Sequence, residues 1–147
     1  MYRKHKNLAG LIAVNKEVNM VEEKIMIVDD NRDLLLELNE ILECSGYCPI
    51  SVSDPSIAFE AAQEEKPDVI LLDLKMDGIN GFQVAHQLKK SKKTAGIPII
   101  CMSGYFPVDK RSTLLDTSDM DACIKKPFGI LDLLTEIERV LAYARIK

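Results

Sequence analysis

Five polar side chains stand at or directly after the ends of short apolar runs in this chain of 147 residues. They are three carboxylates, a hydroxyl and an ammonium group: Asp29, Asp30, Asp73, Ser103 and Lys126. If they met, the carboxylates would repel one another and raise one another's pKa values unless a cation lay among them. Magnesium prefers carboxylate, carbonyl and water oxygens and usually keeps a substrate phosphate among its ligands. The set therefore predicts a magnesium pocket, which would also suit Mn2+.

The same set fits chemistry on a phosphoryl group. A carboxylate such as that of Asp73 can act as a nucleophile and form an aspartyl phosphate. Lys126 offers a point charge for phosphate oxygens, and Ser103 offers a hydroxyl donor. Taken singly, each residue is an ordinary helix cap, turn residue or strand exit. Only their joint occurrence predicts a phosphoacceptor, because phosphoryl transfer depends mainly on positioning and charge neutralisation.

Alternating apolar runs and helical patterns position this set. The apolar runs predict strands over 24–28, 48–53, 68–73, 98–102 and 122–125. The helical patterns predict helices over 31–45, 54–65, 81–90, 109–117 and from 130 onward, with a loop over 75–80. Such alternation indicates βαβ units, hence a parallel sheet with helices on both faces. Because ligands bind beyond the carboxyl ends of such strands, the polar side chains are expected at one edge of the sheet.

Two helices carry more specific expectations. Asp54 is predicted to cap the second helix, with Pro55 as its first residue. The last helix is expected to place six apolar residues on one face: Ile130, Leu133, Leu134, Ile137, Val140 and Leu141.

Composition narrows the class of protein. The length fits one domain, and the net charge of −4 disfavours direct binding to nucleic acid or to an anionic membrane. Apolar runs all fall short of the roughly 20 residues that span a bilayer. The cysteines are interpreted as small buried thiols in a reducing cytoplasm: Cys44, Cys48, Cys101 and Cys123.

Residues 1–21 differ from the rest of the chain. Their basic and apolar residues loosely imitate a signal peptide, but Asn15, Lys16 and Glu17 follow in place of a small-residue cleavage site. We interpret this segment as a flexible arm or a start-site extension, with translation starting functionally at Met20. The domain is predicted over 22–147, in the cytoplasm.

The motifs IMIVDD, DVILLDLKMDGINGF, PIICMSG and IKKPF occur in this order. Together they resemble the receiver domain of response regulators in two-component and phosphorelay systems, including the chemotaxis regulators, over about residues 22–145. The resemblance implies a flavodoxin-like, three-layer α/β/α fold. Its doubly wound parallel sheet has five strands in the order 2-1-3-4-5 and is accompanied by five helices.

The resemblance also implies roles at the site. Asp73 is the phosphorylation site, and it ligates magnesium together with Asp30 and the backbone carbonyl of Lys75. Asp29 acts on the metal through water. No further cofactor is implied.

Four other residues receive roles from the resemblance. Ser103 swings toward the phosphoryl group, and Lys126 pairs with it. Pro127 follows Lys126 through what is often a cis peptide. Gly81 permits the tight loop before the third helix.

The chain departs from the family pattern at three positions, Cys123, Asp77 and Lys75. Cys123 stands where the family carries a tyrosine or phenylalanine that takes part in switching, and Tyr105 is a candidate for that task. Asp77 replaces the proline that usually follows Met76, and it is expected to point to water. Lys75 and Tyr105 occupy positions that modulate phosphoryl lifetime.

The resemblance predicts a signalling phosphoacceptor that catalyses only its own phosphotransfer and dephosphorylation. Its partners would be a sensor histidine kinase or a histidine phosphotransfer protein, and an unidentified output protein. It would be a monomer or a phosphorylation-dependent dimer, and its end after the last helix favours a stand-alone receiver. Two alternatives remain: a phosphorylation-independent scaffold, suggested by Cys123, and a magnesium-dependent phosphatase, which usually has an aspartate where Lys75 stands.

Overall fold

The computed structural model describes residues 22–76, 78–104 and 119–146. The proposed arm over 1–21, the side chains of Asp77 and Tyr105, and the helix predicted over 109–117 lie outside the described residues. Predictions made for those segments stay predictions.

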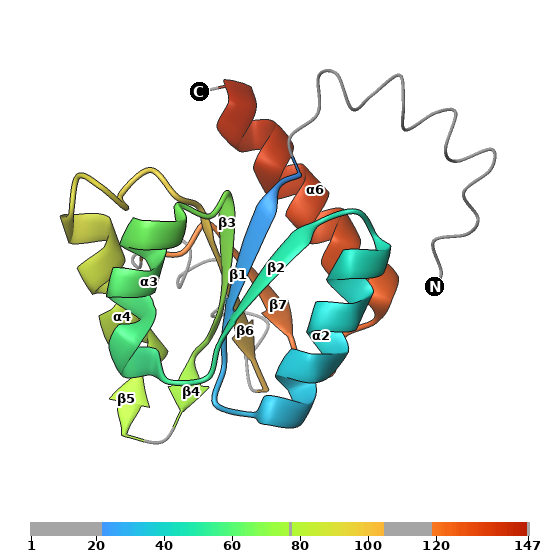
Figure 1. Ribbon diagram of the computed structural model, residues 1–147, viewed down its shortest axis with the longest axis horizontal. Helices are drawn as coiled ribbons and strands as arrows, with labels where there is room; N and C mark the ends of the chain where they lie inside the picture. The colour runs from blue at the N-terminus through green and yellow to red at the C-terminus, as the bar shows by residue number, and fades with distance from the viewer. Residues whose placement is uncertain (1–21, 77, 105–118, 147) are drawn as a thin grey trace.

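Five strands form one parallel sheet, as predicted (Figure 1). They are β1 (Lys24–Val28), β2 (Cys48–Val52), β3 (Val69–Asp73), β6 (Ile99–Ser103) and β7 (Ala122–Lys125). Their order across the sheet is β2-β1-β3-β6-β7, which is the order 2-1-3-4-5 when these five strands are counted along the chain. The fold class and the strand order are therefore confirmed.

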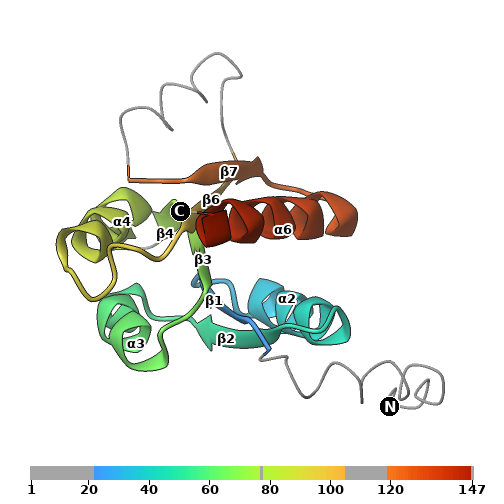
Figure 2. The ribbon, with the colours of Figure 1, turned by 90° about the horizontal axis from the view of Figure 1, so that it is seen from above.

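Four α-helices among the described residues cover the two faces of the sheet. They are α2 (Arg32–Cys44), α3 (Ala58–Glu65), α4 (Gly81–Lys90) and α6 (Ile130–Ile146). Figure 2 shows α3 and α4 on one side of the sheet and α2 and α6 on the other. The molecule has the three layers that a doubly wound fold requires.

The apolar core follows the alternation of side chains along the strands. In β1, Ile25 and Ile27 pack in the cluster formed with α2 and α6, whereas Met26 and Val28 pack in the cluster formed with α3 and α4. All four side chains are buried. Strands covered on both faces read as continuous apolar runs, which explains why the sequence signalled them so clearly.

The helix boundaries differ from the predicted ones in small ways. Asp54 does act as an N-cap, but of a short 3-10 turn, η1 (Pro55–Ile57), from which α3 continues. In α6, Leu133, Ile137, Val140 and Leu141 are buried as predicted. Leu134 is partly buried, whereas Ile130, the first residue of the helix, is half exposed.

The predicted loop over 75–80 contains a small hairpin. Strand β4 (Lys75–Met76) pairs antiparallel with β5 (Ile79–Asn80). Gly78 has a φ of +81°, a left-handed backbone conformation that glycine adopts without strain. Two-residue strands are too short to leave a periodic signal in the sequence, so the pattern showed only a loop.

The interpretation of the cysteines needs correction. Cys101 and Cys123 are buried as predicted, but they form a disulfide rather than remaining thiols. They are direct partners in the register of β6 and β7, with Cα atoms 4.5 Å apart. Cys44 is exposed and Cys48 is partly exposed, so neither is a buried thiol. A separation of 22 residues along the chain gives no hint of this pairing.

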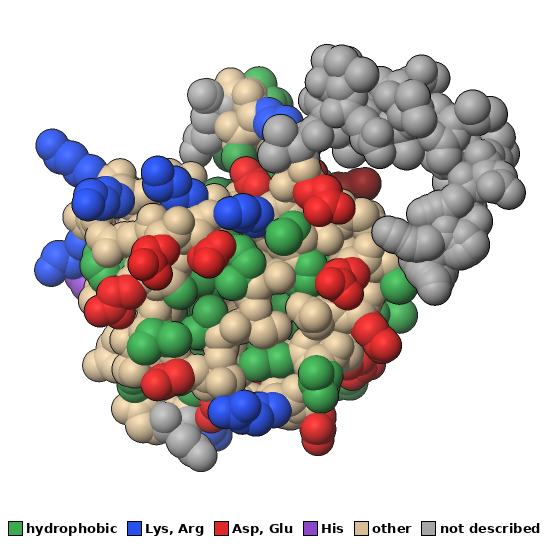
Figure 3. All heavy atoms as spheres, viewed as in Figure 1, with side chains coloured by type: hydrophobic (Ala, Val, Ile, Leu, Met, Phe, Trp, Pro, Cys, Tyr) green, Lys and Arg blue, Asp and Glu red, His purple; other side chains and the backbone are tan. Residues whose placement is uncertain are grey.

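Charged side chains are unevenly distributed on the face seen in Figure 3. Acidic side chains are spread over it, whereas Lys and Arg side chains gather near the end of α4. Within the described residues, no helix has both the length and the apolar character needed to cross a membrane.

Gly81 lies where the backbone leaves no room for a side chain. A Cβ atom at this position would approach the Asp73 carbonyl oxygen to 2.4 Å and the Leu74 Cα to 2.7 Å. Gly81 also donates a backbone hydrogen bond of 3.1 Å to the Leu74 carbonyl. The start of α4 is thus packed against the end of β3, which carries Asp73.

We expect Gly81→Ala to lower the free energy of unfolding by about 1–3 kcal/mol, because the contacts are with backbone that must shift. Gly96→Ala is the matched control, since a Cβ there would meet nothing within 4 Å. The control should change stability by less than about 0.5 kcal/mol. Urea unfolding followed by circular dichroism measures both, and equal stability of the two variants would contradict the close-contact argument.

Candidate functional site

The carboxyl ends of four strands bring the predicted side chains to one edge of the sheet. Asp29 follows β1, Asp73 ends β3, Ser103 ends β6 and Lys126 follows β7. In the register of β3 and β6, Asp73 is paired with Met102, so Ser103 lies one residue farther along the neighbouring strand. The parallel arrangement therefore produces the convergence that the sequence predicted.

Three carboxylates form a compact cluster at this edge. Asp29, Asp30 and Asp73 each offer one oxygen atom, and these atoms lie within 4.8 Å of one another. Asp29 and Asp73 are only 1% and 6% exposed, whereas Asp30 is exposed. The cluster thus consists of two buried carboxylates and one that is exposed to solvent.

Lys126 provides the positive charge next to this cluster. Its Nζ atom donates to Asp29 Oδ2 at 2.8 Å and to Asp73 Oδ1 at 3.3 Å. Its backbone N–H donates to the Ser103 carbonyl at 2.7 Å, which continues the pairing of β6 with β7. The Lys126–Pro127 peptide is cis, in agreement with the expectation from the family.

Two backbone contacts orient Asp29. The N–H of Asn31 donates to Asp29 Oδ1 at 2.9 Å, and the N–H of Asp29 donates to the Val52 carbonyl at 3.1 Å. Asn31 also caps α2 through its own side chain. The sequence did not predict the direct ion pair of Asp29 with Lys126. The local signal for the orientation of Asp29 was the Asp-x-Asn spacing before a helix, which is typical of a turn.

Burial and neighbouring charge oppose each other at Asp73. Burial and the charge of Asp29 raise the pKa of Asp73, while Lys126 and a hydrogen bond from the Lys75 backbone lower it; the net result is a raised pKa. For Lys126, burial lowers the pKa, but the hydrogen bonds and charges of Asp29 and Asp73 outweigh burial and raise it. The ammonium group is therefore firmly protonated, and the carboxylate of Asp73 is less stable as an anion than an exposed one.

The remaining predicted residues lie at different distances from this cluster. Lys75 lies two residues after Asp73; its side chain is exposed, and its backbone N–H donates a hydrogen bond to the Asp73 carboxylate. Cys123 lies within β7, buried in the apolar cluster of the α3 and α4 face. Asp77 and Tyr105 lie outside the described residues.

The arrangement can hold a divalent cation next to the Asp73 carboxylate, which is the candidate nucleophile. Three clustered carboxylates repel one another, and a hard divalent cation relieves that repulsion. Among the described residues, no buried side-chain nitrogen or oxygen lacks a hydrogen-bond partner. The buried carboxylate of Asp73 is in direct contact with the ammonium group of Lys126.

Comparison with known proteins identifies the family. The model of the response regulator receiver domain matches residues 25–138. The chain belongs to this family. Receiver domains serve two-component signalling, and the matched range contains every residue of the site described above.

Three relatives support the assignment to this family. The chain is 38% identical over 80 residues to protein PilH of Pseudomonas aeruginosa, covering 54% of this chain and 66% of that protein. It is 28% identical over 124 residues to sporulation initiation phosphotransferase F of Bacillus subtilis, covering 83% of this chain and 96% of that protein. Against the phosphate regulon regulator PhoB of Pseudomonas aeruginosa, identity is 32% and the match spans only 53% of that protein.

Solved receiver structures share the fold. A CheY-like receiver domain from Methanospirillum hungatei superposes with a TM-score of 0.76 at 26% identity, covering 85% of this chain and 98% of that one. A response regulator from Desulfuromonas acetoxidans gives a TM-score of 0.72 at 28% identity, covering 82% and 98%. The flavodoxin-like architecture is therefore shared along nearly the whole length of both relatives.

We expect Asp73→Asn to raise the melting temperature of the metal-free protein at pH 7 by about 2–8 °C, on the scale of roughly 1 kcal/mol. The pKa of Asp73 is raised above 3.8 by folding, so ionisation at pH 7 opposes folding, and a neutral amide removes that opposition. Calorimetry in the presence of a chelator measures the shift. Glu64→Gln, an exposed carboxylate on α3, is the control and should leave the melting temperature unchanged. A lower melting temperature for Asp73→Asn would contradict the inferred repulsion.

Proposed function

We propose that this protein accepts a phosphoryl group on Asp73 in a magnesium-dependent reaction and signals through a surface that phosphorylation shifts. The observation that carries the proposal is the position of the Asp73 carboxylate. It lies within 4.8 Å of the oxygens of Asp29 and Asp30, and 3.3 Å from the ammonium of Lys126. Membership in the receiver family supports the phosphoacceptor role.

The donor set fits magnesium. Ligand oxygens about 2.1 Å from an octahedral ion lie roughly 3–4 Å from one another, which the spacing of the three carboxylates allows. In our proposal Asp30 and Asp73 ligate the ion directly, the Lys75 carbonyl adds a backbone oxygen, and Asp29 acts through water. When bound, the ion offsets negative charge on the phosphoryl oxygens; Mn2+ would do the same.

The chain's own residues carry out the transfer. An Asp73 carboxylate oxygen attacks the phosphorus of a phosphohistidine, the P–N bond breaks, and the histidine nitrogen keeps the electron pair. Lys126 is already within 3.3 Å of the Asp73 carboxylate, so it can exchange that contact for a phosphoryl oxygen without leaving Asp29. Ser103, at the end of the adjacent strand, offers its hydroxyl to another oxygen.

Phosphorylation would then shift an equilibrium between two arrangements of the protein. It adds roughly −1.5 to −2 charges and strong acceptor oxygens to the site. Contacts of Ser103 and Lys126 with these oxygens favour one arrangement over the other. Loss of the phosphoryl group to water resets the state, so the protein acts on no substrate other than its own phosphoryl group. Tyr105 and Asp77 stay candidates for modulating this step.

A groove beside Lys126 supports a protein partner as the phosphoryl donor. It lies between α2 and the start of α6 and is lined by apolar side chains including Leu34, Ile41 and Phe128. Ile130, at its rim, is half exposed. A helical histidine kinase or phosphotransfer protein could cover these side chains while presenting its histidine to Asp73. We propose that these contacts occur in the cytoplasm, that the output goes to a further protein rather than to nucleic acid or a membrane, and that the protein is a monomer or a phosphorylation-dependent dimer.

Treatment with acetyl phosphate and magnesium should raise the intact mass of the protein by one phosphoryl group. Asp73→Asn should abolish this gain, because it removes the nucleophile. Asp68→Asn is the control, since Asp68 precedes β3 at the opposite edge of the sheet, and it should be phosphorylated like the wild type. A protein that gains no mass under any condition would be a scaffold, and one that rapidly hydrolyses unrelated phosphoesters would be a phosphatase.

Asp30→Ala should weaken magnesium binding at least about tenfold, since even residues one shell away from a metal typically change affinity by 10–100-fold. Isothermal titration calorimetry gives the dissociation constants. Asp33→Ala, which removes an exposed carboxylate from the first turn of α2, controls for the general loss of negative charge and should keep near-native affinity. Unchanged affinity in Asp30→Ala would refute the ligand assignment.

A further inference from the structure

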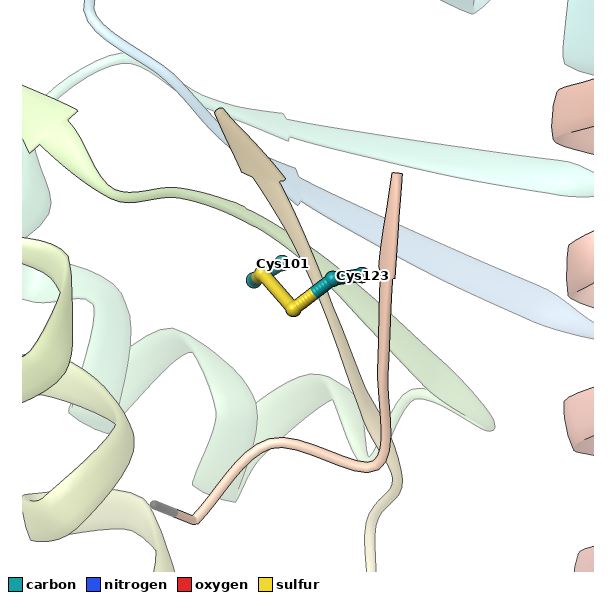
Figure 4. Close-up of a disulfide and its surroundings, with 2 residues drawn as sticks. All are labelled: Cys101 and Cys123. Carbon is teal, nitrogen blue, oxygen red and sulfur yellow. A yellow bond between two sulfur atoms is a disulfide. The ribbon is translucent and has the colours of Figure 1, made fainter. Parts of the chain in front are cut away.

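The Cys101–Cys123 disulfide joins two neighbouring strands inside the core. Figure 4 shows it bridging β6 and β7. The two residues are 0% and 1% exposed, and they belong to the apolar cluster between the sheet and the helices α3 and α4. Their Cα separation of 4.5 Å lies within the range that disulfides occupy.

On each of three strands, the disulfide or its direct strand partner lies within three residues of a side chain of the proposed phosphoryl site. Cys101 precedes Ser103 by two residues, so the two side chains lie on the same face of β6. Cys123 precedes Lys126 by three residues, and the β3 partner of Cys101 is Leu72, which adjoins Asp73. The bond therefore joins β6, which positions the Ser103 hydroxyl, to β7, which positions the Lys126 ammonium group.

Breaking the bond must change the local packing. Bonded sulfur atoms lie about 2.0 Å apart, whereas atoms in non-bonded contact need about 3.5–4.0 Å. Protein cores are close-packed, so sulfur atoms that separate by such an amount must displace their neighbours or the strands themselves. The apolar cluster that holds the two cysteines also contains Met76, Val84 and Met120.

We propose that Cys101 and Cys123 form a reversible redox couple, and that their bond slows the phosphorylation of Asp73 by restraining β6 against β7. The second half rests on the proposed function; the first half does not. Disulfides of cytoplasmic proteins, where they occur, are usually transient and catalytic or redox-sensing. Together with the cytoplasmic location proposed above, this favours a regulatory bond over a permanent one.

Exchange with a small-molecule disulfide balances the reaction. One cysteine thiolate attacks a sulfur of the small disulfide, forms a mixed disulfide and releases one small thiolate. The second cysteine thiolate attacks the protein sulfur of the mixed disulfide and releases the other small thiolate. The protein loses two electrons, the small disulfide gains them, and the two protons from the cysteines end on the two released thiols.

Burial makes this exchange slow but does not prevent it. Among the strands that the structure describes, β7 is at the edge of the sheet, has four residues and pairs with β6 alone. Edge elements open locally at lower free energy than the centre of a sheet, and opening exposes both sulfur atoms together. Cys44, which is exposed, provides an internal standard that should react without such opening.

The redox half is tested on the full chain carrying Cys44→Ser and Cys48→Ser, so that only the pair remains. The folded protein is incubated with oxidised glutathione or with dithiothreitol, then denatured, alkylated and weighed by intact mass. We expect no alkylation after the first treatment and two alkylated cysteines after the second, with the far-ultraviolet circular dichroism of both forms native-like. Thiols that never join in the folded protein, or a bond that is reduced only when the protein unfolds, would overturn the proposal. In the native sequence, Cys44 should be modified faster than the pair.

The coupling half is tested by treating both forms with acetyl phosphate and magnesium. The reduced form should be phosphorylated at least about threefold faster than the bonded form, a modest value for coupling through packed side chains. Adding Cys101→Ala and Cys123→Ala should give one rate that is the same with and without reductant. Equal rates for the bonded and reduced forms would overturn the coupling while leaving the phosphoacceptor role intact. If neither form gains mass, the proposed function fails and the coupling fails with it, whereas the redox couple is still decided by the alkylation measurement.

Discussion

The buried carboxylates of Asp29 and Asp73 share one ammonium group, and the site is organised around this contact. Burial and mutual repulsion both disfavour the ionised forms of two neighbouring carboxylates. Lys126 offsets part of that penalty by donating to both, at 2.8 Å and 3.3 Å. To do so its side chain extends from the exit of the edge strand β7 to the ends of β3 and β1, so one ion-pair cluster links three strands of the sheet.

This shared contact constrains the surrounding backbone. The carboxylates must stand at the same edge, which a parallel sheet provides because all its strands end there. The Asn31 N–H fixes the orientation of Asp29, and Gly81 allows α4 to begin against the carbonyl of Asp73. The apolar strands also need helices on both faces, and α3 and α4 cover one face while α2 and α6 cover the other. Charge, backbone geometry and layer packing thus all contribute to the position of the Asp29 and Asp73 carboxylates.

The disulfide adds a second chemical link between the strands of the site. Lys126 connects β7 with β1 and β3 by charge at the sheet edge, and Cys101–Cys123 connects β7 with β6 by a covalent bond within the apolar core. An ion pair is altered by a new phosphoryl charge, whereas the disulfide is altered by electron transfer. Under the two proposals, phosphorylation would act on β7 through Lys126, and a change of redox state would act on it through Cys123.

The sequence alone determined the parallel α/β fold and the position of five polar residues at the carboxyl ends of its strands: Asp29, Asp30, Asp73, Ser103 and Lys126. It could do so because buried parallel strands read as continuous apolar runs and polar residues mark their ends. The resemblance to receiver domains supplied the strand order and the cis peptide before Pro127. Only the tertiary structure decided the β4–β5 hairpin, the direct contact of Lys126 with Asp29, and the bond between Cys101 and Cys123. Each of these depends on register or on side-chain reach between segments that are distant along the chain or too short to carry a period, and residue types along a single chain do not encode such distances.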